Sequence, residues 1–133
     1  MEERGNSDTE KARPGRVLIV DDESNIRQAF ADLLSDEGYE VTTAHNGRAA
    51  LDDLEAQPAD LVLMDIRMPV LDGVTATRIL KAGDATKHTP VIIMSAGSNL
   101  QMHQGELLQI ADAVIEKPID FDRLLATMQA LLK

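Results

Sequence analysis

Short hydrophobic runs and amphipathic segments alternate along most of the chain. Unbroken runs of about four apolar residues are typical of strands that are covered on both faces, and apolar residues that recur every three to four positions are typical of helices. The runs predict strands at 16–20, 39–44, 61–64, 91–94 and 111–116. The helical spacing predicts helices from Ser24 to Gly38, from Ala50 to before Pro58, from Asp72 to Gly83, over 98–110, and from Asp120 to the chain end.

Strands that are separated by helices indicate βαβ units. Such units pair their strands in parallel, with right-handed crossovers and helices on both faces of the sheet. We therefore predict one α/β domain over residues 16–133, with a doubly wound five-stranded parallel sheet. Residues 1–15 mix both charges with glycine, serine and proline and show no periodicity. This composition predicts a disordered N-terminal tail.

The third predicted strand ends in an acid, Asp65. An aspartate after a strand is often the N-cap of the next helix. Here Pro69 follows, and the next helical signal begins at Asp72, which can cap that helix itself. We therefore interpret Asp65 as a functional acid around which the following loop is built.

Other strands also end in residues that can carry chemistry. Asp21 and Asp22 follow the first strand, Ser95 follows the fourth and Lys117 follows the fifth. Because the carboxyl ends of parallel strands meet at one edge, where ligands bind in open α/β sheets, we expect these side chains to lie together with Asp65. Three carboxylates there would repel one another, since a pair at ~4 Å costs about 4 kcal/mol at an effective dielectric near 20.

A hard divalent cation would cancel this repulsion. Ligands that are all oxygen favour Mg²⁺, with Mn²⁺ also possible, whereas the chain has no cysteine and no clustered histidines for zinc. A shared proton or an Asp–Lys salt bridge is the simpler alternative. A cation, the Ser95 hydroxyl and the Lys117 ammonium together could hold a phosphoryl group, with the Asp65 carboxylate as the nucleophile that forms an acyl phosphate.

Composition restricts the class of protein. The chain has 133 residues, a formal net charge of −10 and no cysteine. Its acidity argues against direct nucleic-acid binding, because phosphate backbones require a basic surface. No apolar run is long enough for a membrane span or a signal peptide, and we expect a soluble, cytoplasmic protein.

Four motifs in this order resemble the response-regulator receiver domains of two-component signalling. They are VDDE at 20–23, MDIRMPVLDG at 64–73, MSA at 94–96 and EKP at 116–118. The similarity extends from Arg16 to the chain end. It implies a flavodoxin-like fold with strand order 2-1-3-4-5, and phosphotransfer from a histidine kinase or a histidine phosphotransfer protein.

The resemblance also implies a role for each matching residue. Asp65 would be the phosphoacceptor, Asp22 and Asp65 would bind Mg²⁺ directly, and Asp21 would bind it through water. The backbone carbonyl of Arg67 would complete the metal ligands. Ser95, the Ala96 N–H and Lys117 would contact the phosphoryl group, and the Lys117-Pro118 peptide bond is expected to be cis.

Two positions depart from the family pattern. Val114 replaces the aromatic residue whose rotation usually reports phosphorylation, and Ile110 replaces a common glycine. We hypothesise that the Ser95 loop and the fourth helix alone report phosphorylation, to a protein partner that could bind the fourth helix, the fifth strand and the fifth helix. The protein is not expected to turn over a separate substrate.

Two alternatives remain open. One is a phosphorylation-independent pseudo-receiver that acts as an interaction module. The other is a small enzyme or flavin carrier of the same fold class. Two minor expectations concern single residues: Glu23 as a capping or first-turn residue, and Met68 and Met102 as exposed partner contacts.

Overall fold

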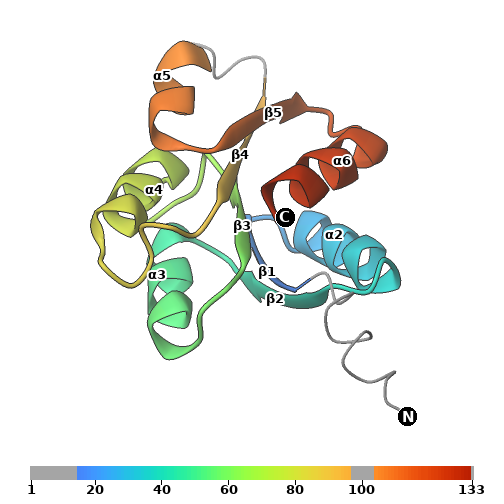
Figure 1. Ribbon diagram of the computed structural model, residues 1–133, viewed down its shortest axis with the longest axis horizontal. Coiled ribbons are helices and arrows are strands. Elements are labelled where there is room, and N and C mark those ends of the chain that lie inside the picture. The colour runs from blue at the N-terminus through green and yellow to red at the C-terminus, as the bar shows by residue number, and fades with distance from the viewer. Residues whose placement is uncertain (1–14, 97–103, 133) are drawn as a thin grey trace.

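The computed structural model describes residues 15–96 and 104–132. Within these ranges five strands alternate with five helices (Figure 1). The strands are β1 (Arg16–Val20), β2 (Glu40–Ala44), β3 (Leu61–Asp65), β4 (Val91–Ala96) and β5 (Ala113–Lys117). The helices are α2 (Ser24–Asp36), α3 (Gly47–Ala56), α4 (Gly73–Ala82), α5 (Gln104–Ile110) and α6 (Phe121–Leu131). None of these helices is long and apolar enough to span a membrane.

All five strands pair in parallel, in the order β2-β1-β3-β4-β5. The predicted fold class and strand order are therefore confirmed. Helices α3, α4 and α5 cover one face of the sheet, and α2 and α6 cover the other (Figure 1). Parallel strands need such crossovers, and the helices exclude water from both faces.

Successive strand side chains point to opposite faces and form two hydrophobic clusters. One cluster joins Val62, Met64 and Ile93 to α3, α4 and α5 through Leu54, Leu80 and Leu107. The other joins Leu61, Leu63 and Ile92 to α2 and α6 through Leu34, Leu124 and Met128. Strand β3 is buried throughout, and β1 and β4 are buried except at one end residue each, which explains their unbroken apolar runs.

Local signals in the sequence set the helix ends. Asp72 and Asp120 cap α4 and α6 by accepting bonds from Thr75 N and Arg123 N, as predicted. The end of α2 is a Schellman motif, in which Gly38, at φ 97°, donates to Ser35 O and Tyr39 donates to Leu34 O. The positive φ is why glycine suits this position.

We use the term amino edge for the sheet edge where the strands begin. Polar groups at this edge are closely paired. Arg16 N donates to Asp60 Oδ2 and Asp60 N donates to Arg16 O, both at 2.8 Å. Lys81 Nζ lies 2.8 Å from Asp112 Oδ2, which also accepts a 2.8 Å bond from Val91 N. These bonds connect the start of β4 to α4 and to the segment that precedes β5.

The Asp112 bonds correct one predicted boundary. We expected the fifth strand to begin at Ala111, but it begins at Ala113. Ala111 N donates to Leu107 O and so continues the turn of α5, while Asp112 N donates to Val91 O. The apolar sequence alone does not show that these two residues turn the chain into the strand.

The prediction of an exposed Met68 is wrong, because this side chain is only 9% exposed and packs in the core. Conversely, Leu33, Ile79 and Leu108, which carry the helical apolar pattern, are each more than 40% exposed. The predicted tail, apart from Gly15, and residues 98–103 of the predicted fourth helix, with Met102, lie outside the described residues. The Gly15 carbonyl accepts a bond from Glu40 N.

Candidate functional site

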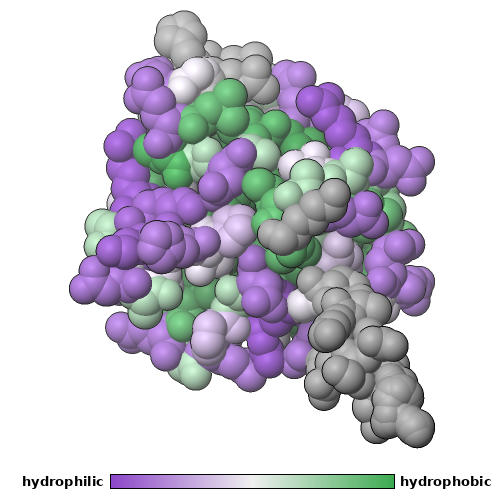
Figure 2. Space-filling view, in the orientation of Figure 1, coloured by the Kyte–Doolittle hydropathy of each residue, from purple (hydrophilic) through white to green (hydrophobic). Residues whose placement is uncertain are grey.

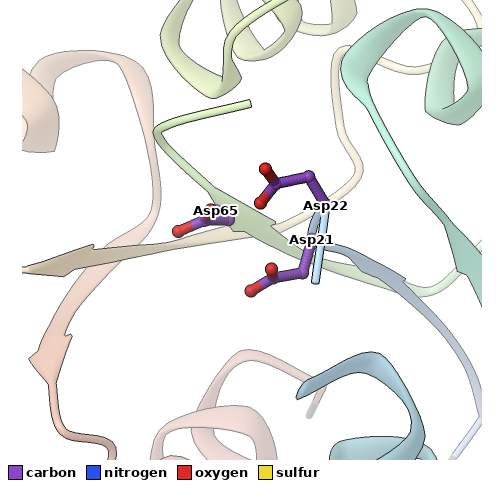
Figure 3. A group of neighbouring side chains, drawn as sticks. All are labelled: Asp21, Asp22 and Asp65. Carbon is purple, nitrogen blue, oxygen red and sulfur yellow. The ribbon is translucent and has the colours of Figure 1, made fainter. Parts of the chain in front are cut away.

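Three acids come together where β1 and β3 end, at what we call the carboxyl edge (Figure 3). Asp21 and Asp22 follow β1, and Asp65 is the last residue of β3. One carboxylate oxygen from each lies within 4.8 Å of the other two. Asp21 is fully buried, Asp65 is 5% exposed and Asp22 is exposed. The cluster is therefore open to solvent on the Asp22 side.

Lys117, the last residue of β5, brings a positive charge to these acids. Its Nζ donates to Asp65 Oδ1 at 2.8 Å and lies 3.6 Å from Asp21 Oδ2. The Lys117-Pro118 peptide bond is cis, as the family resemblance implied. The salt bridge that we considered as an alternative to a metal is thus present. Among the described residues, Asp21 has only the longer contact with Lys117, and Asp22 has no salt bridge.

Burial raises the pKa of Asp65 above its ordinary value. The hydrogen bond from Lys117 acts in the opposite direction, and the charges of Asp21 and Asp22 raise the pKa further. Burial alone would lower the pKa of Lys117, but the bond to Asp65 and the nearby negative charges outweigh burial and raise it. Without another cation, the folded protein therefore disfavours the ionised form of Asp65.

The Asp21 carboxylate provides a test of whether a metal would fit. Its Oδ1 accepts a bond from Glu23 N at 3.0 Å. Its Oδ2 is buried and has no hydrogen-bond partner among the described residues, although Lys117 Nζ lies 3.6 Å away. An unsatisfied buried carboxylate oxygen is costly, and a bound cation, directly or through water, would satisfy it. The donor atoms are all oxygen, which fits Mg²⁺ or Mn²⁺.

The loop that follows Asp65 folds back tightly against it. Gly73 N donates to Ile66 O at 2.8 Å. A Cβ atom at Gly73 would lie 2.0 Å from Asp65 O and 2.9 Å from its carbonyl carbon. Only glycine allows this approach, so the first residue of α4 fixes the backbone of the acceptor acid.

Within this loop, Val70 has an unusual conformation. Its φ is +72°, which is rare for a β-branched residue, and its side chain is 78% exposed. Beside the loop, a groove of about 550 Å³ is lined by residues that include Asp22, Arg67 and Met68. Of the three acids, only the exposed Asp22 lines this groove.

The remaining predicted site residues lie on neighbouring segments: Ser95 and Ala96 end β4, and Arg67 lies in the loop after β3. The Ser95 side chain is buried and its hydroxyl donates to Ala96 O at 3.2 Å. Ala96 is the register partner of Lys117 on β5. Arg67 lies two residues after Asp65 in the loop and is exposed.

Arg27 is the residue at this site that we did not predict. It lies one turn into α2, is half-buried, and donates from Nη1 to the backbone carbonyl of Asp21 at 2.7 Å. Glu23 is the N-cap of α2 by position, but its side chain makes no capping bond. The only hint in the sequence was the position of Arg27 shortly after the acidic pair.

The two departures from the family pattern lie in one cluster. Val114 on β5 and Ile110 at the end of α5 are half-buried and pack against the cluster that contains Leu107 and Ile93. His45 and His88 are exposed and lie outside the acidic cluster.

Comparison with known proteins is consistent with this geometry. A sequence model of the family described as "Response regulator receiver domain" matches residues 17–129. Among curated relatives, the polar-differentiation response regulator DivK of Brucella anthropi is 36% identical over 123 residues, which cover 90% of this chain and 97% of DivK. The response regulator MprA of Mycolicibacterium vanbaalenii is 36% identical over 121 residues, but the chain spans only 51% of its length.

Solved structures agree. The signal receiver domain of a signal transduction histidine kinase from Syntrophus aciditrophicus has a TM-score of 0.83 at 30% identity, with 89% of each chain covered. The chemotaxis response regulator CheY4 of Vibrio cholerae has a TM-score of 0.79 at 32% identity, with 88% of this chain and 98% of CheY4 covered.

Proposed function

This chain belongs to the response regulator receiver domain family, and we propose that it is a phosphoacceptor module. Asp65 accepts a phosphoryl group from a histidine kinase or a histidine phosphotransfer protein, and the domain then changes the face that it shows to a protein partner. One observation carries the proposal: a nearly buried Asp65 lies beside Asp21 and Asp22 and is bonded to Lys117. A purely structural scaffold would have no use for this costly cluster.

We assign the metal ligands from the same cluster. Asp22 and Asp65 would bind Mg²⁺ or Mn²⁺ directly, Asp21 through water, and Arg67 through its backbone carbonyl. When bound, the cation would offset the charges of the acids and of the transferred phosphoryl oxygens. The buried Asp21 Oδ2 without a hydrogen-bond partner supports this assignment.

In the transfer step, Asp65 Oδ2 attacks the phosphorus of the donor's phosphohistidine. A P–O bond forms and the P–N bond breaks; its electron pair stays on the imidazole nitrogen, which takes up a proton from solvent. Lys117, now bonded to Asp65 Oδ1, holds the carboxylate in place and then pairs with the phosphoryl oxygens. The Ser95 hydroxyl leaves Ala96 O and, with the Ala96 N–H, donates to the phosphoryl group.

We propose that Ser95 and α5 report the modification, because Val114 lacks the aromatic ring that usually does so. The partner would contact α5, β5 and α6. Amide hydrogen exchange with and without beryllofluoride, an acyl-phosphate mimic, tests this readout. Protection of the described part of α5 should change, and equal exchange rates in both states would contradict the proposal.

Intact mass spectrometry after incubation with acetyl phosphate and Mg²⁺ tests the proposed function. The wild type should gain one phosphoryl group, roughly 80 mass units. The gain should require Mg²⁺ and disappear in Asp65→Asn. Asp84→Asn is the matched control, because Asp84 is an exposed acid on the loop before β4 and should leave labelling unchanged.

The second candidate is a phosphorylation-independent interaction module, which Val114 favours. A protein that binds Mg²⁺ but gains no mass from acetyl phosphate should next be incubated with a phosphorylated histidine phosphotransfer protein. Absence of labelling from both donors would contradict the phosphoacceptor proposal and leave the interaction module.

A further inference from the structure

We propose that Arg27 is a positioning residue for the divalent-cation site: its bond to the backbone carbonyl of Asp21 holds the acidic turn after β1 in a metal-binding arrangement. The inference rests on the proposed function, since it concerns the cation that phosphotransfer would need. It adds to the family's ligands a residue that touches neither metal nor phosphate.

The bonds of Asp21 show what Arg27 does. Asp21 N donates to Ala44 O at 3.2 Å, Asp21 Oδ1 accepts from Glu23 N at 3.0 Å, and Asp21 O accepts from Arg27 Nη1 at 2.7 Å. The Asp21 oxygen without a hydrogen bond is Oδ2, at the acid cluster. Three bonds therefore fix this residue, and the fourth polar atom, Oδ2, has only the 3.6 Å contact with Lys117 Nζ and remains available to a ligand.

The Arg27 bond also acts on Asp22, because the Asp21 carbonyl belongs to the peptide unit that links the two aspartates. Rotation of that peptide would turn the exposed Asp22 carboxylate away from Asp65. The guanidinium comes from the first turn of α2, so one bond connects the helix to the end of β1.

The location of Arg27 argues that this bond matters. A cation near a helix N-terminus opposes the helix dipole, and α2 has neither a side-chain cap nor an acid in its first turn to compensate. Instead, the guanidinium bonds to the backbone between Asp21 and Asp22. Partners that orient metal ligands typically contribute about 10- to 100-fold to metal affinity.

A positioning role and a purely electrostatic role for Arg27 predict opposite effects of its removal on Mg²⁺ affinity. If Arg27 acts only as a nearby positive charge, its removal should tighten Mg²⁺ binding, because one repulsive charge is lost. If it positions the turn, Arg27→Met should weaken Mg²⁺ binding by about tenfold despite the more negative site. A purely structural role would lower the thermal stability of the apoprotein and leave the affinity unchanged.

Isothermal titration calorimetry with MgCl₂ at constant ionic strength separates these cases. The matched control is Arg78→Met, which removes the same charge from an exposed arginine on α4 and should bind Mg²⁺ like the wild type. Arg27→Lys keeps the positive charge and an N–H donor, and should recover part of the Mg²⁺ affinity that Arg27→Met loses. Circular dichroism at each temperature used would confirm that all three variants are folded.

The outcomes separate the two proposals. Weaker binding by Arg27→Met, with partial recovery in Arg27→Lys, supports the inference. Equal or tighter binding by Arg27→Met overturns it while leaving the proposed function intact. A wild type that binds neither Mg²⁺ nor Mn²⁺ overturns the inference together with the metal ligands assigned above.

Discussion

The two edges of the sheet treat charge in opposite ways. At the amino edge, Asp112 Oδ2 accepts bonds from Lys81 and Val91, and Asp60 exchanges bonds with the backbone of Arg16. At the carboxyl edge, Lys117 pairs with Asp21 and Asp65, and Asp22 lies beside them with no salt bridge among the described residues. The difference teaches that this fold is held at one edge, so that the other can keep charges that only a ligand would balance.

The backbone differs in the same way. The carboxyl edge contains the positive φ of Val70 and the close approach of Gly73 to Asp65. Unfavourable conformations concentrate where a site needs a particular geometry, and the surrounding structure must compensate for them. Removing an acid should therefore destabilise the protein at the amino edge and stabilise it at the carboxyl edge, whereas a larger side chain at Gly73 should destabilise it.

Gly73→Ala should have the largest effect. The added Cβ would collide with the Asp65 backbone, and we expect a loss of about 3 kcal/mol in the free energy of unfolding, measured by urea denaturation. Gly105→Ala is the matched control: outside its chain neighbours and the backbone of α5, no atom of the described residues lies within 4 Å of its Cβ position, so it should stabilise by about 0.5 kcal/mol. A fully stable Gly73→Ala would show that the loop can move away from Asp65.

Asp112→Ala should remove the bonds that connect the start of β4 to Asp112 and α4 at the amino edge. It removes the partner of the half-buried Lys81 and of the N–H of the buried Val91, and should lower the free energy of unfolding by about 1 to 2 kcal/mol in urea denaturation. Asp84→Ala removes an exposed ion pair with Lys87 at 3.7 Å and should cause no measurable change. Equal effects of both substitutions would contradict the proposed anchoring role of this edge.

In contrast to Asp112→Ala, Asp65→Asn should stabilise the metal-free protein, by on the order of 1 kcal/mol at neutral pH. It removes a negative charge that burial, Asp21 and Asp22 disfavour. The folded-state pKa of Asp65 is raised above 3.8, so stability from its protonated form is complete below 3.8 and is lost as the pH rises through the raised pKa. The stability gained by Asp65→Asn over the wild type should therefore increase over that same pH window. Thermal unfolding at several pH values measures it, and a variant less stable than wild type at neutral pH would contradict the interpretation.

Val70→Asn should give a similar or smaller gain, about 1 kcal/mol, because asparagine tolerates a positive φ better than valine does. Leu108→Asn controls for the loss of an exposed apolar side chain on ordinary helical backbone, and should not stabilise. If both substitutions stabilise equally in urea denaturation, hydrophobic exposure rather than backbone strain explains the effect.

Much of this architecture follows from local sequence. The unbroken runs of β1, β3 and β4 and the caps Asp72 and Asp120 depend on residues close together in the chain, and they were predicted. Parallel pairing then brings Asp21, Asp22 and Asp65 to one edge without further information. The cis bond at Lys117-Pro118 was implied only by the family resemblance.

What the sequence did not predict depends on contacts between distant residues. Asp112 ends the α5 turn by bonding to Val91, 21 residues earlier, so the start of β5 was misplaced. Met68 was expected to be exposed, but the tight loop that Gly73 permits carries it into the core. The Arg27 bond depends on the rotamer of a long side chain, which no local pattern determines.

The Schellman motif at the end of α2 has a practical consequence. Tyr39 is the single tyrosine of a chain without tryptophan, and it is 7% exposed at the start of β2. It lies about one strand length, roughly 16 Å, from the carboxyl edge, since a strand rises by ~3.3 Å per residue. Burial raises the pKa of its phenol. Intrinsic fluorescence and alkaline absorbance of this protein therefore report global unfolding, and events at Asp65 require an introduced label.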